Sequence, residues 1–373
     1  MGSLRRRLRQ RGEPPREVIA GTKRSFGKLI RHFAIRGVWG FSILLVVEYL
    51  VLPQLAGFSK TLNLLGTANY WLVPLAVLAE AASLFCYAKL TSSVLPTPQP
   101  PLKSLAKVDV SALAVSHVLP GGTASGAGMT VRLLTSLGVK GTDAGFALAA
   151  QGIGSAVVLN LMLWIALIVS LPIYGFNEIY LIVAAIGVLL LGAFSALVIA
   201  FTRGETRTLA VMRRLINPIR PLRRHEAAIT GSVSRISYRI NALASDPVRL
   251  RSAVLWASLN WLFDALSLWI MVAAFGRIVD PDALLVSYGI ANVAAALPIT
   301  PGGLGVIEGI LIPLITGFGT PRSVAILGVL GYRLFNFWIP IPVGVGTYVS
   351  LKLGRGEDIT MELEKLKRDP PRG

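Results

Sequence analysis

The sequence predicts an all-α, polytopic membrane protein with about six full spans and two interrupted, re-entrant hairpins arranged as an inverted repeat. Three observations lead to this prediction. Of the 373 residues, 53% are hydrophobic and only 15% are charged, whereas about a quarter of the residues in a soluble domain are charged. Apolar stretches of about 20 residues, long enough to cross a hydrocarbon core of about 30 Å, separate short blocks of charge. Two further apolar stretches are broken by the same tripeptide, Pro-Gly-Gly.

Six uninterrupted apolar stretches have the length of a membrane-spanning helix. They cover residues 38–56, 70–89, 144–173, 179–201, 252–275 and 323–353. The stretches 108–137 and 281–319 are instead interrupted near their middle, by Pro-Gly-Gly at 120–122 and at 301–303. Proline and glycine end or kink a helix, so each of these stretches is predicted to contain a break.

The basic residues predict which connections face the cytoplasm, because cytoplasmic loops carry an excess of Lys and Arg. The N-terminal arm 1–37, the connector near 89–107, the tail and the loop 202–251, which holds eleven arginines, should therefore lie inside. Between that connector and that loop, two full spans already make an even number of crossings. The stretch 108–137 is therefore predicted to enter and leave from the cytoplasmic side.

The same count after the arginine-rich loop predicts that 281–319 enters from the outer side. The units 69–173 and 252–353 then share the order span, broken hairpin, span, in opposite orientations. Such inverted repeats are typical of transporters with a substrate site near the membrane midplane. We expect three parts: a basic cytoplasmic arm at 1–37, a transmembrane domain at 38–353 and a cytoplasmic tail at 354–373.

Charged side chains near the predicted midplane are candidates for substrate binding, because each costs about 2.5–3.5 kcal/mol unless it is paired or hydrated. Arg333 lies about ten residues, or roughly 15 Å, into its span. Arg132 follows the first break by ten residues. Arginine suits a lipid phosphate because its planar guanidinium forms two parallel hydrogen bonds. Asp264 and Glu308 are further candidates for the site. An internal salt bridge of Arg333 with either of them is the alternative, and both can hold in turn if substrate displaces the carboxylate.

Glycines at the breaks are the second group of candidates, namely Gly121, Gly122, Gly302 and Gly303. They let a ligand approach the backbone, and the helix after each break would point its N-terminal amides at a phosphate. A structural kink or close helix packing is the alternative. Tyr332 is a further candidate for lining the site, with polar contact between helices as the alternative.

The sequence contains no nucleotide-binding loop, metal-ligand spacing or catalytic triad, so we expect no enzymatic activity, no cofactor and no metal. The Gly-rich stretch 121–128 does not follow a predicted strand, which argues against a dinucleotide loop. The formal net charge of +18 indicates attraction to anionic phospholipid headgroups. Nucleic-acid binding is not expected, because the basic segments adjoin apolar spans and lack interleaved aromatic residues.

Three motifs occur together in this chain. They are Leu119-Pro-Gly-Gly-Thr-Ala-Ser-Gly126 followed by Arg132, Thr300-Pro-Gly-Gly-Leu-Gly305 followed by Glu308, and Tyr332-Arg333-Leu334. Over about residues 38–353 the chain resembles the transmembrane region of the lysylphosphatidylglycerol synthase/flippase family. The resemblance implies an integral membrane protein related to lipid flippases, which moves aminoacylated or other phospholipids or polyprenyl-linked lipids between leaflets.

The chain departs from that family in its first half. Gln151 stands where an arginine of an acidic–Arg pair is often found, Gly122 where an arginine commonly follows Pro-Gly, and Ala127 in place of an acidic residue. The first half-site is therefore less charged than the family pattern. The bifunctional members carry a soluble aminoacyl-transferase domain, which the last 20 residues here cannot hold, so synthase activity is not expected.

The sequence thus predicts a multi-pass lipid translocase of a cell inner (plasma) membrane, with both termini in the cytoplasm. Two other functions stay open. One is a secondary transporter of a small anion or amino acid that uses Glu308 or Glu80 for proton coupling. The other is a non-transporting accessory protein of envelope lipid synthesis. Membrane lipids are the expected partners, and assembly into a homo-oligomer is left open.

Overall fold

A computed structural model describes residues 68–119, 122–174, 246–295 and 300–353, together with isolated residues at 66, 185, 188, 189 and 192. All of them belong to one compact unit, 53–373. The predicted basic arm, the predicted span 38–56 and the tail lie outside the described residues, as do almost all of the predicted span 179–201 and of the arginine-rich loop. Gly121 does too.

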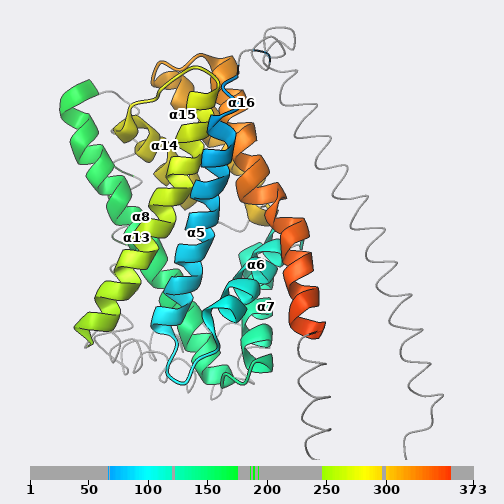
Figure 1. Cartoon of the computed structure of the whole chain (residues 1–373). Coiled ribbons are helices and arrows are strands. Elements are labelled where there is room, and N and C mark those ends of the chain that lie inside the picture. The colour runs from blue at the N-terminus through cyan, green and yellow to red at the C-terminus, as the bar shows by residue number, and fades with distance from the viewer. Residues whose placement is uncertain are drawn as a thin grey trace, which may run out of the picture. The chain divides into compact units, whose positions relative to one another are not determined.

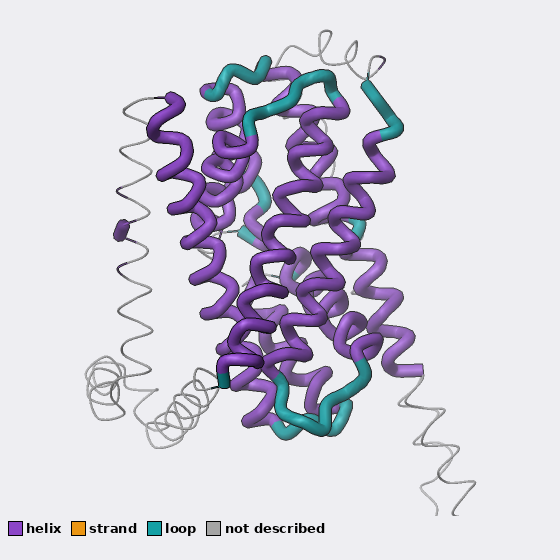
Figure 2. Tube along the Cα trace, turned by 60° about the vertical axis from the view of Figure 1, so that its left-hand side comes forward, coloured by secondary structure: helices purple, strands orange, loops and turns teal. Residues whose placement is uncertain are grey.

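The described residues form helices and loops, with no strand (Figure 2). Four helical segments are long and apolar enough to cross a membrane. They are α5 (Leu72–Val94), α8 (Gly141–Tyr174), α13 (Pro247–Ala274) and the continuous stretch Arg322–Leu353, which begins with α16 (Arg322–Arg333). These segments correspond to four of the six predicted spans, and the prediction of an all-α membrane fold is confirmed.

Both interrupted stretches fold back on themselves, as predicted. The first consists of α6 (Leu102–Val118) and α7 (Gly122–Ser136). The second consists of α14 (Pro281–Ala295), the short η2 (Pro301–Gly303) and α15 (Val306–Gly317). In Figure 1 the α6–α7 pair enters from the end where α5 finishes, and the α14–α15 pair enters from the opposite end, where α13 finishes. This arrangement is the predicted inverted repeat.

The first limb of the first hairpin begins earlier than predicted, at Leu102 instead of residue 108. The reason is that its polar residues find partners on the last helical stretch, 340–353. Lys107 Nζ donates to Ser350 Oγ at 2.7 Å, and the hydroxyls of Ser111 and Thr347 lie 2.9 Å apart. These contacts satisfy the polar side chains of Lys107 and Ser111 within the helix bundle.

Each repeat packs against the other. The first spans of the two units, α5 and α13, run side by side in opposite directions (Figure 1), and α14 of the second unit packs on α8 of the first. Small residues allow close approach: a Cβ on Gly328 of α16 would lie 2.8 Å from Val272 Cα of α13. Membrane helices associate through such van der Waals packing, because lipid tails are as apolar as the side chains.

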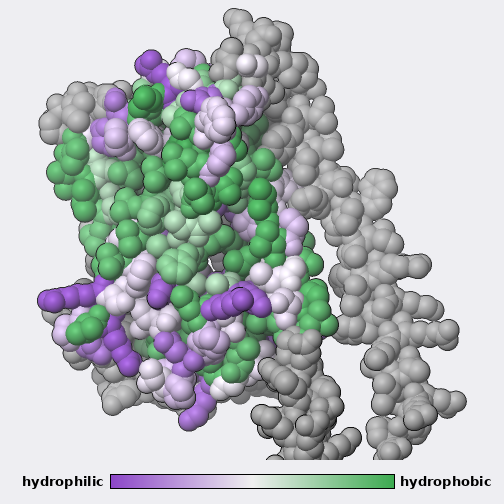
Figure 3. All heavy atoms as spheres, viewed as in Figure 1, coloured by the Kyte–Doolittle hydropathy of each residue, from purple (hydrophilic) through white to green (hydrophobic). Residues whose placement is uncertain are grey.

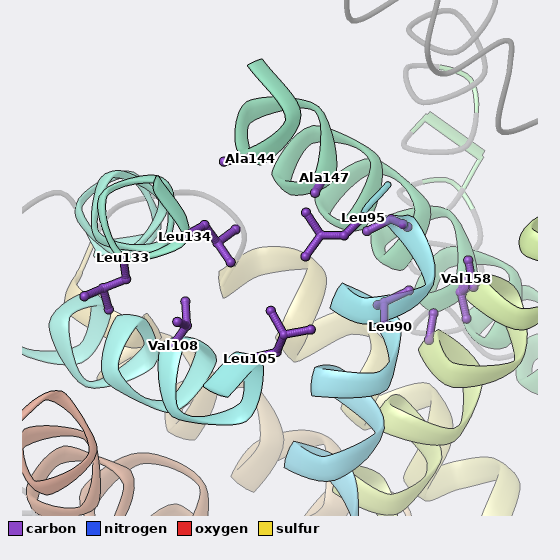
Figure 4. Close-up of a cluster of buried hydrophobic side chains, with 12 residues drawn as sticks. Leu90, Leu95, Leu105, Val108, Leu133, Leu134, Ala144, Ala147 and Val158 are labelled. Atoms are coloured by element: carbon purple, nitrogen blue, oxygen red, sulfur yellow. The ribbon is translucent and has the colours of Figure 1, made fainter. Parts of the chain in front are cut away.

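A cluster of buried apolar side chains joins the helices around the first hairpin. Leu90 of α5, Leu105 of α6, Leu134 of α7 and Ala147 of α8 belong to it, each at most 2% exposed. Figure 4 shows these side chains converging from the four helices. This packing holds the hairpin limbs in place and thereby sets the position of the break between them.

Apolar side chains also cover the outer surface of the helices. Figure 3 shows a hydrophobic band between polar ends on the face in view. Large side chains such as Leu78, Ile165 and Ile168 are more than half exposed. A continuous band of exposed apolar side chains is typical of a surface that faces lipid.

Candidate functional site

The two hairpin breaks meet at one point inside the helix bundle. A Cβ on Gly122, after the first break, would lie 3.8 Å from the backbone nitrogen of Gly302 in the second. Gly302 has a φ of +56°, and a Cβ there would lie 2.7 Å from His117 Cδ2 and 2.5 Å from Phe337 Cε2. Only glycine allows this conformation together with this approach. The breaks that enter from opposite ends therefore form one site.

Arg333 and Glu308 form a buried ion pair beside these breaks. Each side chain is 1% exposed, and Arg333 Nε donates to Glu308 Oε1. The other guanidinium nitrogens donate to Asn336 Oδ1 and to the carbonyl oxygen of Gly302, both at 3.2 Å. The guanidinium also lies over the Phe337 ring, 4.6 Å from its centroid. Of the two salt bridges considered from the sequence, the one with Glu308 is formed.

The local sequence explains where the two charges are. Glu308 occupies the third position of α15 and accepts a hydrogen bond from the backbone N–H of Gly305 at 2.6 Å. A carboxylate is favourable at this helix end because the unpaired amides carry partial positive charge. In this conformation Glu308 therefore takes the place that the sequence suggested for a phosphate.

Arg333 ends α16 and is followed by a π-helical turn, Leu334–Trp338. π-Helical turns are rare in proteins, and those that do occur are often found at functional sites. Pro340 and Pro342 remove two N–H donors from the next turn. The Phe337 carbonyl pairs with His117 Nδ1 at 3.0 Å. The irregular backbone is thereby tied to the first hairpin.

Asp264 of α13 lies next to this ion pair but has other partners. The hydroxyls of Tyr288 and Tyr332 both donate to it, the second at 3.0 Å, and Asn336 Nδ2 donates to its Oδ1 at 2.8 Å. The same Asn336 nitrogen lies 3.4 Å from Oε1 of Glu80 on α5. Tyr332 and Asp264, both predicted from the sequence, therefore join the site through a second set of contacts.

The structure places Arg132 apart from this site, and its role in substrate binding stays a prediction. Arg132 is exposed on α7, and ten helical residues separate it from the break at Gly122, a distance of about 15 Å. A hairpin limb that begins deep in the bundle carries its later residues outward again. Gly303, another predicted residue, lies at the break of the second hairpin. It has a φ of +69° and its Cβ position packs on Ala295, so it shapes the bend between α14 and α15.

Three contributors to the site were not selected from the sequence, namely Asn336, Phe337 and Tyr288. Asn336 is three residues after Arg333, so a helical periodicity would have placed the two on one face. Tyr288 is a polar residue in an apolar limb, but nothing in the sequence links it to Asp264. The contact between them depends on how α13 and α14 pack.

Gln151, which stands where the family often has an arginine, belongs to a separate polar cluster. Its Nε2 donates to Thr91 Oγ1 at 2.9 Å, and that hydroxyl donates to Asp109 Oδ2 at 2.9 Å. These hydrogen bonds connect α8, α5 and α6. The first half of the chain thus links an amide, a hydroxyl and a carboxyl group by hydrogen bonds, where the second half uses an ion pair.

Comparisons with known proteins show that this chain is similar to membrane proteins. Residues 37–344 match the family described as "Lysylphosphatidylglycerol synthase TM region". A UPF0104 membrane protein of Pyrococcus horikoshii is 23% identical over 314 residues, which cover 80% of this chain and 92% of that protein. The inner membrane protein YbhN of Escherichia coli is 26% identical over 99 residues, 26% of this chain and 30% of that protein. A UPF0104 membrane protein of Methanocaldococcus jannaschii is 27% identical over 115 residues, 31% and 32% of the two chains.

Proposed function

This chain belongs to the family of the lysylphosphatidylglycerol synthase TM region, and we propose that it moves a lipid with an anionic headgroup between the two leaflets of a membrane. The family and the apolar outer surface make it an integral membrane protein. The residues where the two hairpins meet would hold the headgroup, while the acyl chains stay in the bilayer.

One observation carries this proposal. Arg333 is the only buried lysine or arginine among the residues that the structure describes, and it lies where the breaks of both repeats meet. A buried charge of this kind is costly and is a functional-site hypothesis by default in a membrane protein. Its partner Glu308 is an anion, so a phosphate could take its place at Arg333, provided that the displaced Glu308 carboxylate becomes hydrated or protonated. The N–H of Gly305 would then be free to donate to the phosphate.

Translocation would require the two hairpins to open in turn. At 1% exposure Arg333 is shielded in the conformation described here. The hairpins meet through Gly122 and Gly302, both at positive φ. Inverted repeats move by rocking or gating of one repeat against the other around a fixed central site. Opening toward one leaflet and then the other would expose Arg333 to each in succession.

The proposal is tested by lipid transfer in reconstituted vesicles. Fluorescent phosphatidylglycerol in the inner leaflet is protected from a membrane-impermeant quencher, and its appearance outside measures the rate. Arg333→Ala should lower that rate by at least about tenfold, because a hydrogen bond to a charged group contributes about 1.5–3 kcal/mol. Arg333→Lys should recover part of it, since lysine keeps the charge but loses the planar fork.

Arg322 provides a matched control, because it begins the same helix but is exposed. Arg322→Ala should transfer lipid at the wild-type rate. Folded Arg333→Ala protein that also transfers lipid at the wild-type rate would refute the proposal. Vesicles that take up a soluble organic anion but do not move the lipid would instead support a secondary transporter.

A further inference from the structure

We propose that Glu80 and Asp264 together bind one proton, and that this proton is coupled to the binding of an anion at Arg333. The inference rests on the proposed lipid translocation and deepens it by naming the coupling ion. Glu80 and Asp264 are called the acidic pair below. They come from α5 and α13, the first spans of the two repeats.

The geometry brings the two carboxyl groups together in a closed site. Glu80 is 5% exposed and Asp264 is 6% exposed. A single nitrogen, Asn336 Nδ2, lies 2.8 Å from Asp264 Oδ1 and 3.4 Å from Glu80 Oε1. Two carboxylates that share a buried site cannot both carry a negative charge at acceptable cost.

The groups around the acidic pair do not supply the missing positive charge. Tyr288 of α14 and Tyr332 of α16 offer neutral hydroxyls, and both donate to Asp264. Arg333 is already paired with Glu308 of α15. His117 of α6 stacks on Phe337 and bonds its carbonyl oxygen, with no carboxylate contact among its described hydrogen bonds. One proton on the acidic pair leaves a single negative charge, which the two tyrosine hydroxyls and Asn336 can stabilise by hydrogen bonds.

A second observation marks where the proton can reside. Glu80 Oε2 is buried and has no hydrogen-bond partner, whereas every other carboxylate oxygen of Glu80 and Asp264 has one. Buried polar atoms without a partner are rare and call for a specific explanation. A proton on this oxygen neutralises Glu80 without displacing a hydrogen bond that already exists.

Asn336 connects the proton to the anion site. Its Oδ1 accepts from Arg333 Nη1, and its Nδ2 donates to the acidic pair. An anionic headgroup at Arg333 would repel a negative charge on the acidic pair and so favour proton binding there. By thermodynamic reciprocity the bound proton then favours the headgroup by the same factor. Lipid and proton are therefore expected to move in the same direction.

The test is lipid transfer under an imposed pH gradient, in the vesicles described above and with the membrane potential clamped. Wild-type transfer out of the more acidic side should rise by up to about tenfold per pH unit, the limit for one linked proton. Glu80→Gln and Asp264→Asn should each abolish this response. Asp109→Asn is the matched control: it also neutralises a buried carboxyl group, but Asp109 belongs to the separate cluster with Thr91 and Gln151. Its pH response should equal that of the wild type.

Two results would overturn the inference while leaving lipid translocation intact. One is wild-type transfer that does not depend on the gradient, and the other is an unchanged response in both acidic-pair variants. Loss of the response in Asp109→Asn as well would also count against the acidic pair as the site. Wild-type protein that moves no lipid under any gradient would refute the proposed function instead.

Proton binding can then still be measured without transport. Glycerol phosphate, added as a headgroup probe to the detergent-solubilised protein in weak buffer, should cause proton uptake that a pH-sensitive dye reports. The uptake should be present in Asp109→Asn and absent in Glu80→Gln. Equal uptake in both variants would overturn the assignment to the acidic pair.

Discussion

Replacing Gly302 with alanine tests whether the two hairpin breaks are packed against each other. Gly302 has a φ of +56°, and a Cβ there would lie 2.5 Å from Phe337 Cε2 and 2.7 Å from His117 Cδ2. The left-handed conformation costs a non-glycine residue about 1–2 kcal/mol. Overpacking a well-filled interior adds about 1–3 kcal/mol. We therefore expect the free energy of unfolding to fall by about 2–5 kcal/mol.

Two other glycines of the same hairpin separate these contributions. Gly305 has a φ of +79°, but no atom lies within 4 Å of its Cβ position. Gly305→Ala should therefore lose only the backbone contribution of about 1–2 kcal/mol. Gly309 lies within α15 and also has open space at Cβ. Gly309→Ala should stabilise the protein by about 0.5–1 kcal/mol, because alanine loses less backbone entropy in a helix.

The measurement is unfolding of the three variants in detergent, followed by tryptophan fluorescence during a denaturant titration. The expected order of stability is Gly309→Ala, wild type, Gly305→Ala and Gly302→Ala, from most to least stable. If Gly302→Ala is no less stable than Gly305→Ala, the contacts of Gly302 with Phe337 and His117 do not exist. The description of the site as the meeting point of two hairpins would then be wrong.

Three further variants test individual contacts by the same unfolding measurement. Glu308→Gln leaves the charge of Arg333 buried without its partner, so we expect a loss of about 3–5 kcal/mol, and an unchanged midpoint would contradict the ion pair. Gly344→Ala places a Cβ 2.6 Å from the carbonyl oxygen of Val110, so the free energy of unfolding should fall by about 1–3 kcal/mol. Wild-type stability of this variant would mean that α6 does not contact the last helical stretch. Asp246→Ala removes the side chain that accepts two hydrogen bonds at the start of α13, so a loss of about 1 kcal/mol is expected, while Asp246→Asn should retain most of the capping.

Much of the architecture could be predicted because its causes are local. Backbone groups in hydrocarbon must bond within their own segment, so run length and composition alone indicate helices and their approximate ends. The Pro-Gly-Gly tripeptides interrupt a helix whatever surrounds them. The start of α6 at Leu102 could not be predicted, because Lys107 is accommodated by Ser350, more than 200 residues later in the chain.

The candidate residues show where such local reasoning fails. In the sequence Arg132 and Arg333 looked equivalent. Arg132 lies ten residues after the Pro-Gly-Gly break of its hairpin, and Arg333 lies about ten residues after the start of its span. Ten residues from the outer end of a span lead inward, however, whereas ten residues from the tip of a hairpin lead outward. Arg132 is exposed for that reason, while Arg333 is 1% exposed.

The sequence by itself determined that this chain is a helical membrane protein with two interrupted hairpins, and that Arg333, Glu308 and Asp264 are charges in apolar surroundings. These conclusions depend only on the cost of placing polar groups in lipid, which each segment meets independently. Only the tertiary structure decided how the charges are paired. Gly305 holds Glu308 toward Arg333, while helix packing brings two tyrosines and Glu80 to Asp264. Pairing depends on distances between segments far apart in the chain, and such distances are set by packing.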